Sequence, residues 1–194
     1  MKLLTFSTEL EAKSTIDIFK AQSLNHNLYE FDSGHLLITG IGTYNAMSAL
    51  LKQLHQNTYQ YIWNLGIAGS FKNSILGELL PIQSIDKNIS HPLQTDHSLD
   101  FAKTAHPTLC IKDGGAKLLT SDFPIHWKDQ CLSDYDCVDM EGYGIAHAAK
   151  VAGIPLQMDK FISDFTNEEG PQMIREKMEY LSQCMAKHLL SDLD

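Results

Sequence analysis

Arginine is nearly absent from this sequence of 194 residues: Arg175 is the only one, and lysines supply the other positive side chains. Acidic residues number 24 against 15 basic residues, which gives a formal net charge of -9. Proteins that bind nucleic acid gather Lys and Arg on one surface to neutralise phosphates. The composition therefore argues against nucleic acid as a partner.

Cysteine pairs, long apolar runs and metal-binding histidine patterns are also absent. The four cysteines form no CxxC pair and no recognisable framework, so we expect reduced thiols. No segment approaches the roughly 20 apolar residues of a membrane span, and the apolar run over 1–6 is too short for a signal peptide. The nine histidines include no HExxH and no HxH, so we expect no metal. These absences predict a soluble, cytoplasmic protein.

Short apolar runs alternate with amphipathic segments along the chain, which is typical of an α/β protein. Thr8 followed by Glu11 predicts a helix start, and this helix should continue over 12–22. The other predicted helices cover 44–54, 141–152 and 171–190, and the predicted strands cover 2–8, 28–31, 35–39, 61–65, 79–85, 109–111, 117–119, 137–140 and 156–162, with an irregular excursion over 86–107. We expect one domain over 1–194, a three-layer α/β fold whose mixed, mostly parallel sheet is flanked by helices.

The stretch from Cys137 to Lys150 combines a short strand with a helix rich in small residues. Asp139 and Glu141 lie at the changeover with Met140 between them, so strand alternation predicts that the two carboxylates point the same way and Met140 the other. Carboxylates at the C-terminal end of a strand stand where open α/β sheets bind ligands. The alternative is that Glu141 only opens the helix.

Two glycine-rich segments follow predicted strands. Gly40-Ile41-Gly42 resembles half of a dinucleotide fingerprint, but Asn45 holds the third glycine position and no acid ends the next strand. We therefore expect no cofactor and interpret these glycines as a tight turn beside a ligand. The segment 66–69 should end the strand over 61–65 and expose backbone amides to a small ligand.

Three acidic residues, Glu11, Glu141 and Asp164, lie near the ends of three predicted strands. Each has an ordinary explanation on its own, because glutamates suit the first turn of a helix and Ser163-Asp164 suits a turn or cap. Open sheets nevertheless bring such strand ends to one edge. Together the three acids predict one pocket.

Five segments in this order resemble the nucleoside phosphorylase/nucleosidase superfamily, specifically its methylthioadenosine/S-adenosylhomocysteine nucleosidase and futalosine hydrolase branch. They are residues 8–11, 40–46, 64–69, 138–141 and 162–164, so the resemblance spans most of the chain. It implies a nucleoside phosphorylase-like fold, a homodimer, and cleavage of a purine N-ribosidic bond without metal or cofactor.

The resemblance assigns the chemistry to three carboxylates. Glu141 would grip the ribose hydroxyls, Asp164 would protonate N7 of the leaving purine, and Glu11 would activate the attacking water. These roles suit the reaction, because positive charge builds on the ribose as in glycosidases and a protonated purine leaves more easily. A separate ionised carboxylate then accepts a proton from water.

The resemblance also implies the residues that bind the nucleoside. Phe123 would stack on the purine, although a gapless alignment places Pro124 there. Ile41 would lie beside the 5′ substituent and Met140 against the sugar. The remaining substrate-binding candidates are Ile67, Ala68, Gly69, Ile125, Asp139 and Ser163.

Departures from the superfamily favour a hydrolase. Phosphorylases hold phosphate with arginines, whereas Arg175 is alone and late in the chain. Lys160 stands where methylthioadenosine enzymes carry an arginine, which keeps the charge without the forked geometry. The short segment between Ile85 and Leu118 resembles the futalosine side of the branch, whose members act in menaquinone biosynthesis.

The leading hypothesis is therefore hydrolysis of futalosine or 6-amino-6-deoxyfutalosine, with either hypoxanthine or adenine as the leaving base. Methylthioadenosine or S-adenosylhomocysteine is the alternative substrate. A nucleoside phosphorylase and a nucleoside-binding protein without turnover are the further alternatives.

Overall fold

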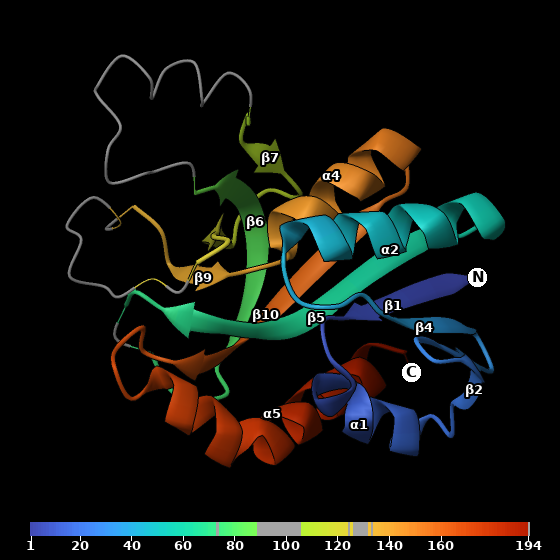
Figure 1. The fold of residues 1–194 in the computed structure, drawn as a ribbon, viewed down its shortest axis with the longest axis horizontal. Coiled ribbons are helices and arrows are strands. Elements are labelled where there is room, and N and C mark those ends of the chain that lie inside the picture. The colour runs from blue at the N-terminus through green and yellow to red at the C-terminus, as the bar shows by residue number, and fades with distance from the viewer. Residues whose placement is uncertain (73, 89–105, 124, 126–131, 133, 194) are drawn as a thin grey trace.

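The computed structural model describes residues 1–72, 74–88, 106–123, 125, 132 and 134–193. Its strands are β1 (Lys2–Phe6), β2 (Gln22–Asn25), β3 (Leu28–Phe31), β4 (Gly34–Ile38), β5 (Tyr61–Ser70), β6 (Leu79–Lys87), β7 (Leu109–Cys110), β8 (Ala116–Thr120), β9 (Cys137–Asp139) and β10 (Leu156–Asp164). Its helices are α1 (Glu9–Ile18), α2 (Thr43–Gln56), α4 (Gly142–Ala152) and α5 (Gly170–Leu193) (Figure 1). None of these helices combines the length and apolar composition needed to cross a bilayer.

The strands form one sheet in the order β10-β6-β8-β9-β5-β1-β4-β3-β2, with β7 beside β6. Parallel ladders join β1 to β4 and β5, β5 to β10, and β8 to β6 and β9, and they contain more residue pairs than the antiparallel ladders. The predicted mixed, mostly parallel sheet is therefore confirmed. Because β10 pairs with both β6 and β5, this half of the sheet closes on itself.

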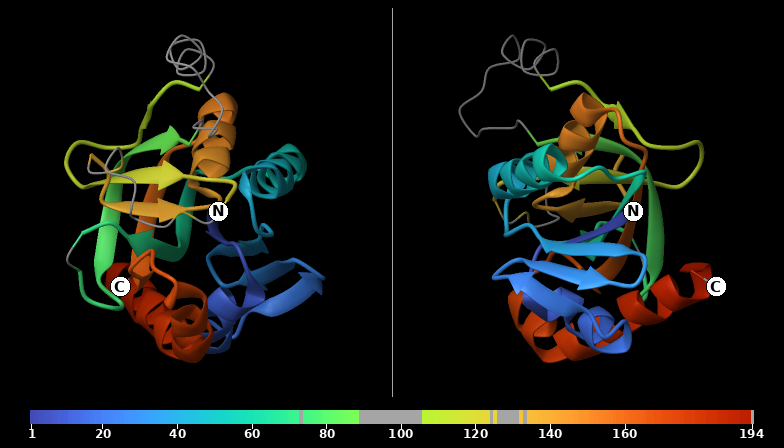
Figure 2. Two further views of the ribbon diagram at one scale, coloured as in Figure 1. Left: turned by 60° about the vertical axis from the view of Figure 1, so that its left-hand side comes forward. Right: turned by 90° about the vertical axis from the view of Figure 1, so that its right-hand side faces the viewer.

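Helices cover both faces of the sheet, as predicted. Figures 1 and 2 show α2 and α4 together on one side and α1 and α5 together on the other. Strand alternation supplies a separate core to each side: Leu3 and Ile62 belong to the core with α2 and α4, whereas Leu4 and Trp63 belong to the core with α1 and α5.

Several local predictions are confirmed and three need correction. The Thr8–Glu11 capping box and the hairpin of β3 and β4 are present. The helix predicted over 12–22 ends at Ile18, because Lys20 adopts a left-handed conformation and β2 begins at Gln22. β5 does not end at Gly66, because its ladder with β10 continues as far as Gly69. The strand β6 extends to residue 87, inside the predicted excursion, and 89–105 lies outside the described residues.

This topology creates one functional edge. β1, β5 and β10 are mutually parallel, so their C-terminal ends point in one direction. β9 runs antiparallel to the end of β5, with Val138 opposite Gly69, and delivers the start of α4 to the same place.

Candidate active site

A cavity of about 360 Å³ lies at this edge of the sheet. Every site residue predicted from the sequence lines it: Glu11, Ile41, Ile67, Ala68, Gly69, Phe123, Ile125, Asp139, Met140, Glu141, Ser163 and Asp164. Topology thus brings together residues from six separate segments of the chain. Their roles remain predictions.

Glu11 is held at the cavity by hydrogen bonds to both of its carboxylate oxygens. As the third residue of α1 it completes the capping box, and its Oε2 accepts from Thr8 N at 2.8 Å and Thr8 Oγ1 at 2.9 Å. The Ser7 hydroxyl donates to the same oxygen. Oε1 accepts from Ile67 N at 3.2 Å and so ties α1 to β5. The capping role and a place in the cavity are therefore compatible.

Glu141 is buried at the N-cap position of α4, but its side chain does not cap that helix. Its Oε1 instead accepts from Gly42 N at 2.7 Å, which explains why the backbone of the Gly40–Gly42 turn must come close. Burial, with Asp139 adding to it, raises the pKa of Glu141 to about 7, despite the opposing effects of Lys160 and the Gly42 bond. This carboxyl therefore changes charge near neutral pH.

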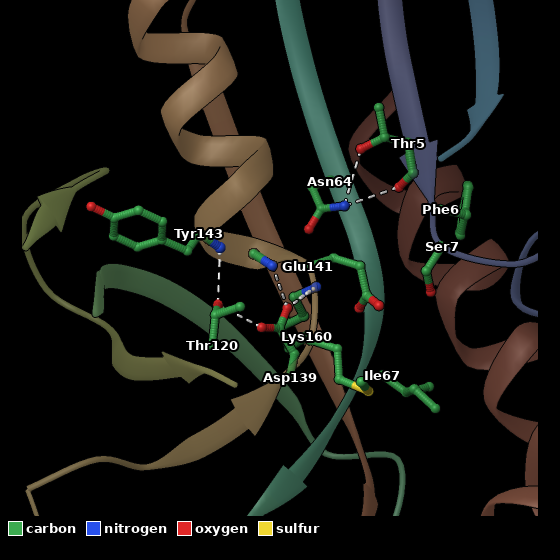
Figure 3. Close-up of polar contacts among 12 residues, drawn as sticks. Thr5, Phe6, Ser7, Asn64, Ile67, Thr120, Asp139, Glu141, Tyr143 and Lys160 are labelled. Atoms are coloured by element: carbon green, nitrogen blue, oxygen red, sulfur yellow. Dashed lines mark hydrogen bonds and ion pairs between the residues drawn. The ribbon is translucent and has the colours of Figure 1, made fainter. Parts of the chain in front are cut away.

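Asp139 and Glu141 do not point the same way, contrary to the prediction from strand alternation. β9 ends at Asp139, so strand alternation does not extend to Glu141, and Figure 3 shows the two carboxylates pointing different ways. Asp139 Oδ1 accepts from Thr120 Oγ1 at 2.7 Å, and Oδ2 accepts from Gly142 N at 2.9 Å and pairs with Lys160 Nζ at 2.9 Å. Met140 lines the cavity as well, instead of pointing away from it.

Asp164 is buried at the end of β10. Its Oδ2 accepts from Ser163 Oγ at 2.8 Å and its Oδ1 from Thr166 N at 2.8 Å. A Cβ on Gly69 or on Gly170 would come within 3.0 Å of Oδ1. Both residues therefore must lack a side chain for this carboxylate to keep its position, which gives the second glycine motif a steric explanation.

The rest of the lining is mainly apolar. Phe123 is 74% exposed and lines the cavity together with Ile41 and Ile125. Ser121 Oγ accepts a hydrogen bond from Phe123 N at 3.2 Å. Pro124, the alternative stacking residue, lies outside the described residues. Sequence reasoning missed the wall formed by α5 and its approach, which consists of Thr166, Asn167, Gly170, Pro171, Ile174 and Met178, and it also missed Ser7 and Thr8. The i, i+4 spacing of residues 170, 174 and 178 was the available signal.

The described residues include no group of three or more side chains that could hold a metal ion. The backbone N–H of Gly42, which a dinucleotide phosphate would need in the fingerprint, already donates to Glu141. The carboxylates of Glu11, Glu141 and Asp164 give this mainly apolar cavity groups that can do acid–base chemistry.

Comparison with known proteins identifies the fold. No protein-family model matches the sequence, and no curated protein matches it. The structure is similar to futalosine hydrolase of Helicobacter pylori strain 26695, with a TM-score of 0.84 and 18% identity over 100% of this chain and 97% of that one. It is also similar to MTAN from Chlamydia trachomatis bound to MTA, with a TM-score of 0.77 and 22% identity over 96% and 93% of the two chains. A mutant of Helicobacter pylori MTAN with 5′-methylthioadenosine in its active site is similar as well, with a TM-score of 0.78 and 19% identity over 100% of this chain and 97% of that one. The chain therefore has the fold of these proteins.

Proposed function

We propose that this protein hydrolyses the N-ribosidic bond of a purine nucleoside modified at its 5′ position. The observation that carries the proposal is the convergence of Glu11, Glu141 and Asp164 on one cavity from three separate parts of the chain. The shared fold with futalosine hydrolase and MTAN supports it.

The three carboxylates account for each proton in the reaction. Water attacks the anomeric carbon of the ribose while the bond to the purine nitrogen breaks. Glu11 takes a proton from the water, and Asp164 gives a proton to N7 of the leaving base. Ionised Glu141 binds the ribose hydroxyls and stabilises the positive charge that develops on the sugar.

Water is favoured over phosphate as the nucleophile. A phosphorylase needs a cationic clamp for its phosphate. Among the described residues that line the cavity there is no arginine and no lysine. Arg175 is exposed on α5.

Futalosine or its 6-amino analogue is our first choice of substrate. The TM-score to futalosine hydrolase is higher than the TM-scores to the two MTAN structures, and in the sequence the segment between Ile85 and Leu118 resembles the futalosine side of the branch. With this substrate we also propose that the protein acts in menaquinone biosynthesis, forms a homodimer and is located in the cytoplasm. Methylthioadenosine is the second candidate, because Pro171, Ile174 and Met178 provide apolar surface suited to a thioether.

The test is release of free base in phosphate-free buffer from each of four compounds: futalosine, 6-amino-6-deoxyfutalosine, methylthioadenosine and S-adenosylhomocysteine. Release from the first pair or the second pair selects the substrate class. Asp164→Asn should slow release by about 10²–10⁴-fold, whereas Asp113→Asn, the same change at an exposed position, should not. Release that requires phosphate would instead make the protein a phosphorylase. Binding without release would indicate a nucleoside-binding protein.

A further inference from the structure

Lys160 is a charged residue inside the protein that the proposed reaction leaves without a role. It lies within β10 and is only 2% exposed. Its Nζ pairs at 2.9 Å with Oδ2 of Asp139 (Figure 3), a residue that lines the cavity. A buried ammonium is costly unless its charge is matched, so its neighbours should reveal its purpose.

The ammonium also lies near Glu11, beside Gly66 of β5. A Cβ on Gly66 would lie 3.1 Å from Lys160 Nζ and 3.5 Å from Glu11 Oε1. The two groups therefore flank the same point on the strand, and only a residue without a side chain leaves that space open. This glycine lets one cation face the carboxylates of both α1 and β9.

The cation has more than one carboxylate to balance. Burial alone would lower the pKa of Lys160, but Asp139, Glu141 and Glu11 together raise it above its ordinary range. The ammonium is thus positive whenever the enzyme would work. Asp139 carries one of the negative charges that this cation balances. The other two carboxylates, Glu141 and Glu11, belong to residues that must be ionised in the proposed reaction.

We propose that Lys160 is a positioning residue whose charge allows Glu141 to ionise beside Asp139 and Glu11. This inference deepens the proposed function and rests on it. Like charges that share a buried site resist joint ionisation, so without the ammonium Glu141 would hold its proton to a higher pH. A protonated Glu141 stabilises the sugar cation less.

The groups that face Glu141 come from four elements. Asp139 of β9 and Glu11 of α1 oppose its ionisation, and Lys160 of β10 and the Gly42 N–H before α2 favour it. Removal of the positive neighbour Lys160 should therefore raise the pKa of Glu141, and removal of the negative neighbour Asp139 should lower it. A purely structural role for the buried pair would not produce that sign change.

The experiment compares the pH dependence of kcat/KM for wild-type protein, Lys160→Met and Asp139→Asn. The acid limb should move to higher pH by about 1–3 units in Lys160→Met and to lower pH in Asp139→Asn. Lys160→Arg keeps the charge and should return the limb toward its wild-type position. Lys52→Met, an exposed lysine on α2, is the matched control and should leave the profile unchanged.

A second readout separates this inference from the proposed function. The side-chain carboxyl carbon of Glu141, assigned with Glu141→Gln, can be titrated by 13C NMR without any substrate. An inactive wild type would refute the proposed function, yet this titration would still test Lys160. Titration curves of Lys160→Met and Asp139→Asn that coincide with wild type, or that move together, would overturn the inference. If Lys160→Met does not fold, Gly66→Ala decides instead, because its Cβ would crowd the ammonium, and an unchanged or lower midpoint for Glu141 contradicts the inference.

Discussion

The burial of Glu141 predicts that the protein loses stability as the pH rises toward neutrality and that Glu141→Gln recovers it. The pKa of this carboxyl rises from 4.5 to about 7 on folding, chiefly because burial disfavours the charged form. The native state therefore binds this proton more tightly than the unfolded chain does. Between these two values the free energy of unfolding must fall as pH increases.

The size of the effect follows from the same shift. Each pKa unit corresponds to about 1.4 kcal/mol, so the full cost of ionising Glu141 in the folded protein is on the order of 3 kcal/mol. It is absent below pH 4.5, where the group is protonated in both states, and complete above about pH 7. Glutamine stays neutral and can still accept the Gly42 N–H bond.

Urea unfolding at a series of pH values measures this difference. Relative to wild type, Glu141→Gln should gain about 2–3 kcal/mol between pH 5 and pH 8, while its kcat/KM falls. Glu168→Gln, an exposed glutamate before α5, should show no comparable gain. A Glu141→Gln advantage that does not grow with pH, or a variant less stable than wild type at pH 8, would refute the reasoning.

Three further predictions concern other parts of the molecule. Asp164→Asn should lower kcat by about 10²–10⁴-fold, the usual contribution of a general acid, with the substrate Kd from calorimetry little changed. Gly66→Ala should move the acid limb of kcat/KM to higher pH, because the added Cβ would lie only 3.1 Å from the Lys160 ammonium and push it aside. His188 on α5 lies 3.1 Å from Asp159, whose hydrogen bond raises the pKa of His188 against the effect of burial. Its stabilising contribution should be complete below pH 6.5 and lost as pH rises through the raised value, and unfolding of His188→Gln should lack this dependence.

The sequence was most informative where local rules and tertiary structure agree. The capping box at Thr8 and Glu11, the hairpin of β3 and β4, and the strand–helix junction at Asp139 all depend on neighbours within a few residues. β2 was missed because all four of its residues are exposed, so it shows no apolar alternation. The end of β5 was misplaced because glycine usually weakens a strand, whereas here it allows close approach by Lys160.

The site was predictable as a set of residues but not as an electrostatic arrangement. Order along the chain indicated which acids meet, since strand ends converge in open sheets. The partner of each acid depends on side-chain directions across distant segments. Asp139 and Glu141 show this clearly: two residues apart, one pairs with Lys160 and the other with the backbone of Gly42.

The carboxylates of the site differ in how many hydrogen bonds they accept from the protein. Each oxygen of Glu11, Asp139 and Asp164 accepts at least one hydrogen bond within the described structure. Among the described residues, Glu141 has one donor, Gly42 N–H, and its second oxygen has none. A buried carboxylate that lacks donors is costly to ionise, and hydroxyl groups supply the missing donors. The cost of ionising Glu141 is therefore the physical counterpart of its proposed role, because the ribose hydroxyls of a bound nucleoside would donate to the oxygen that has no donor among the described residues.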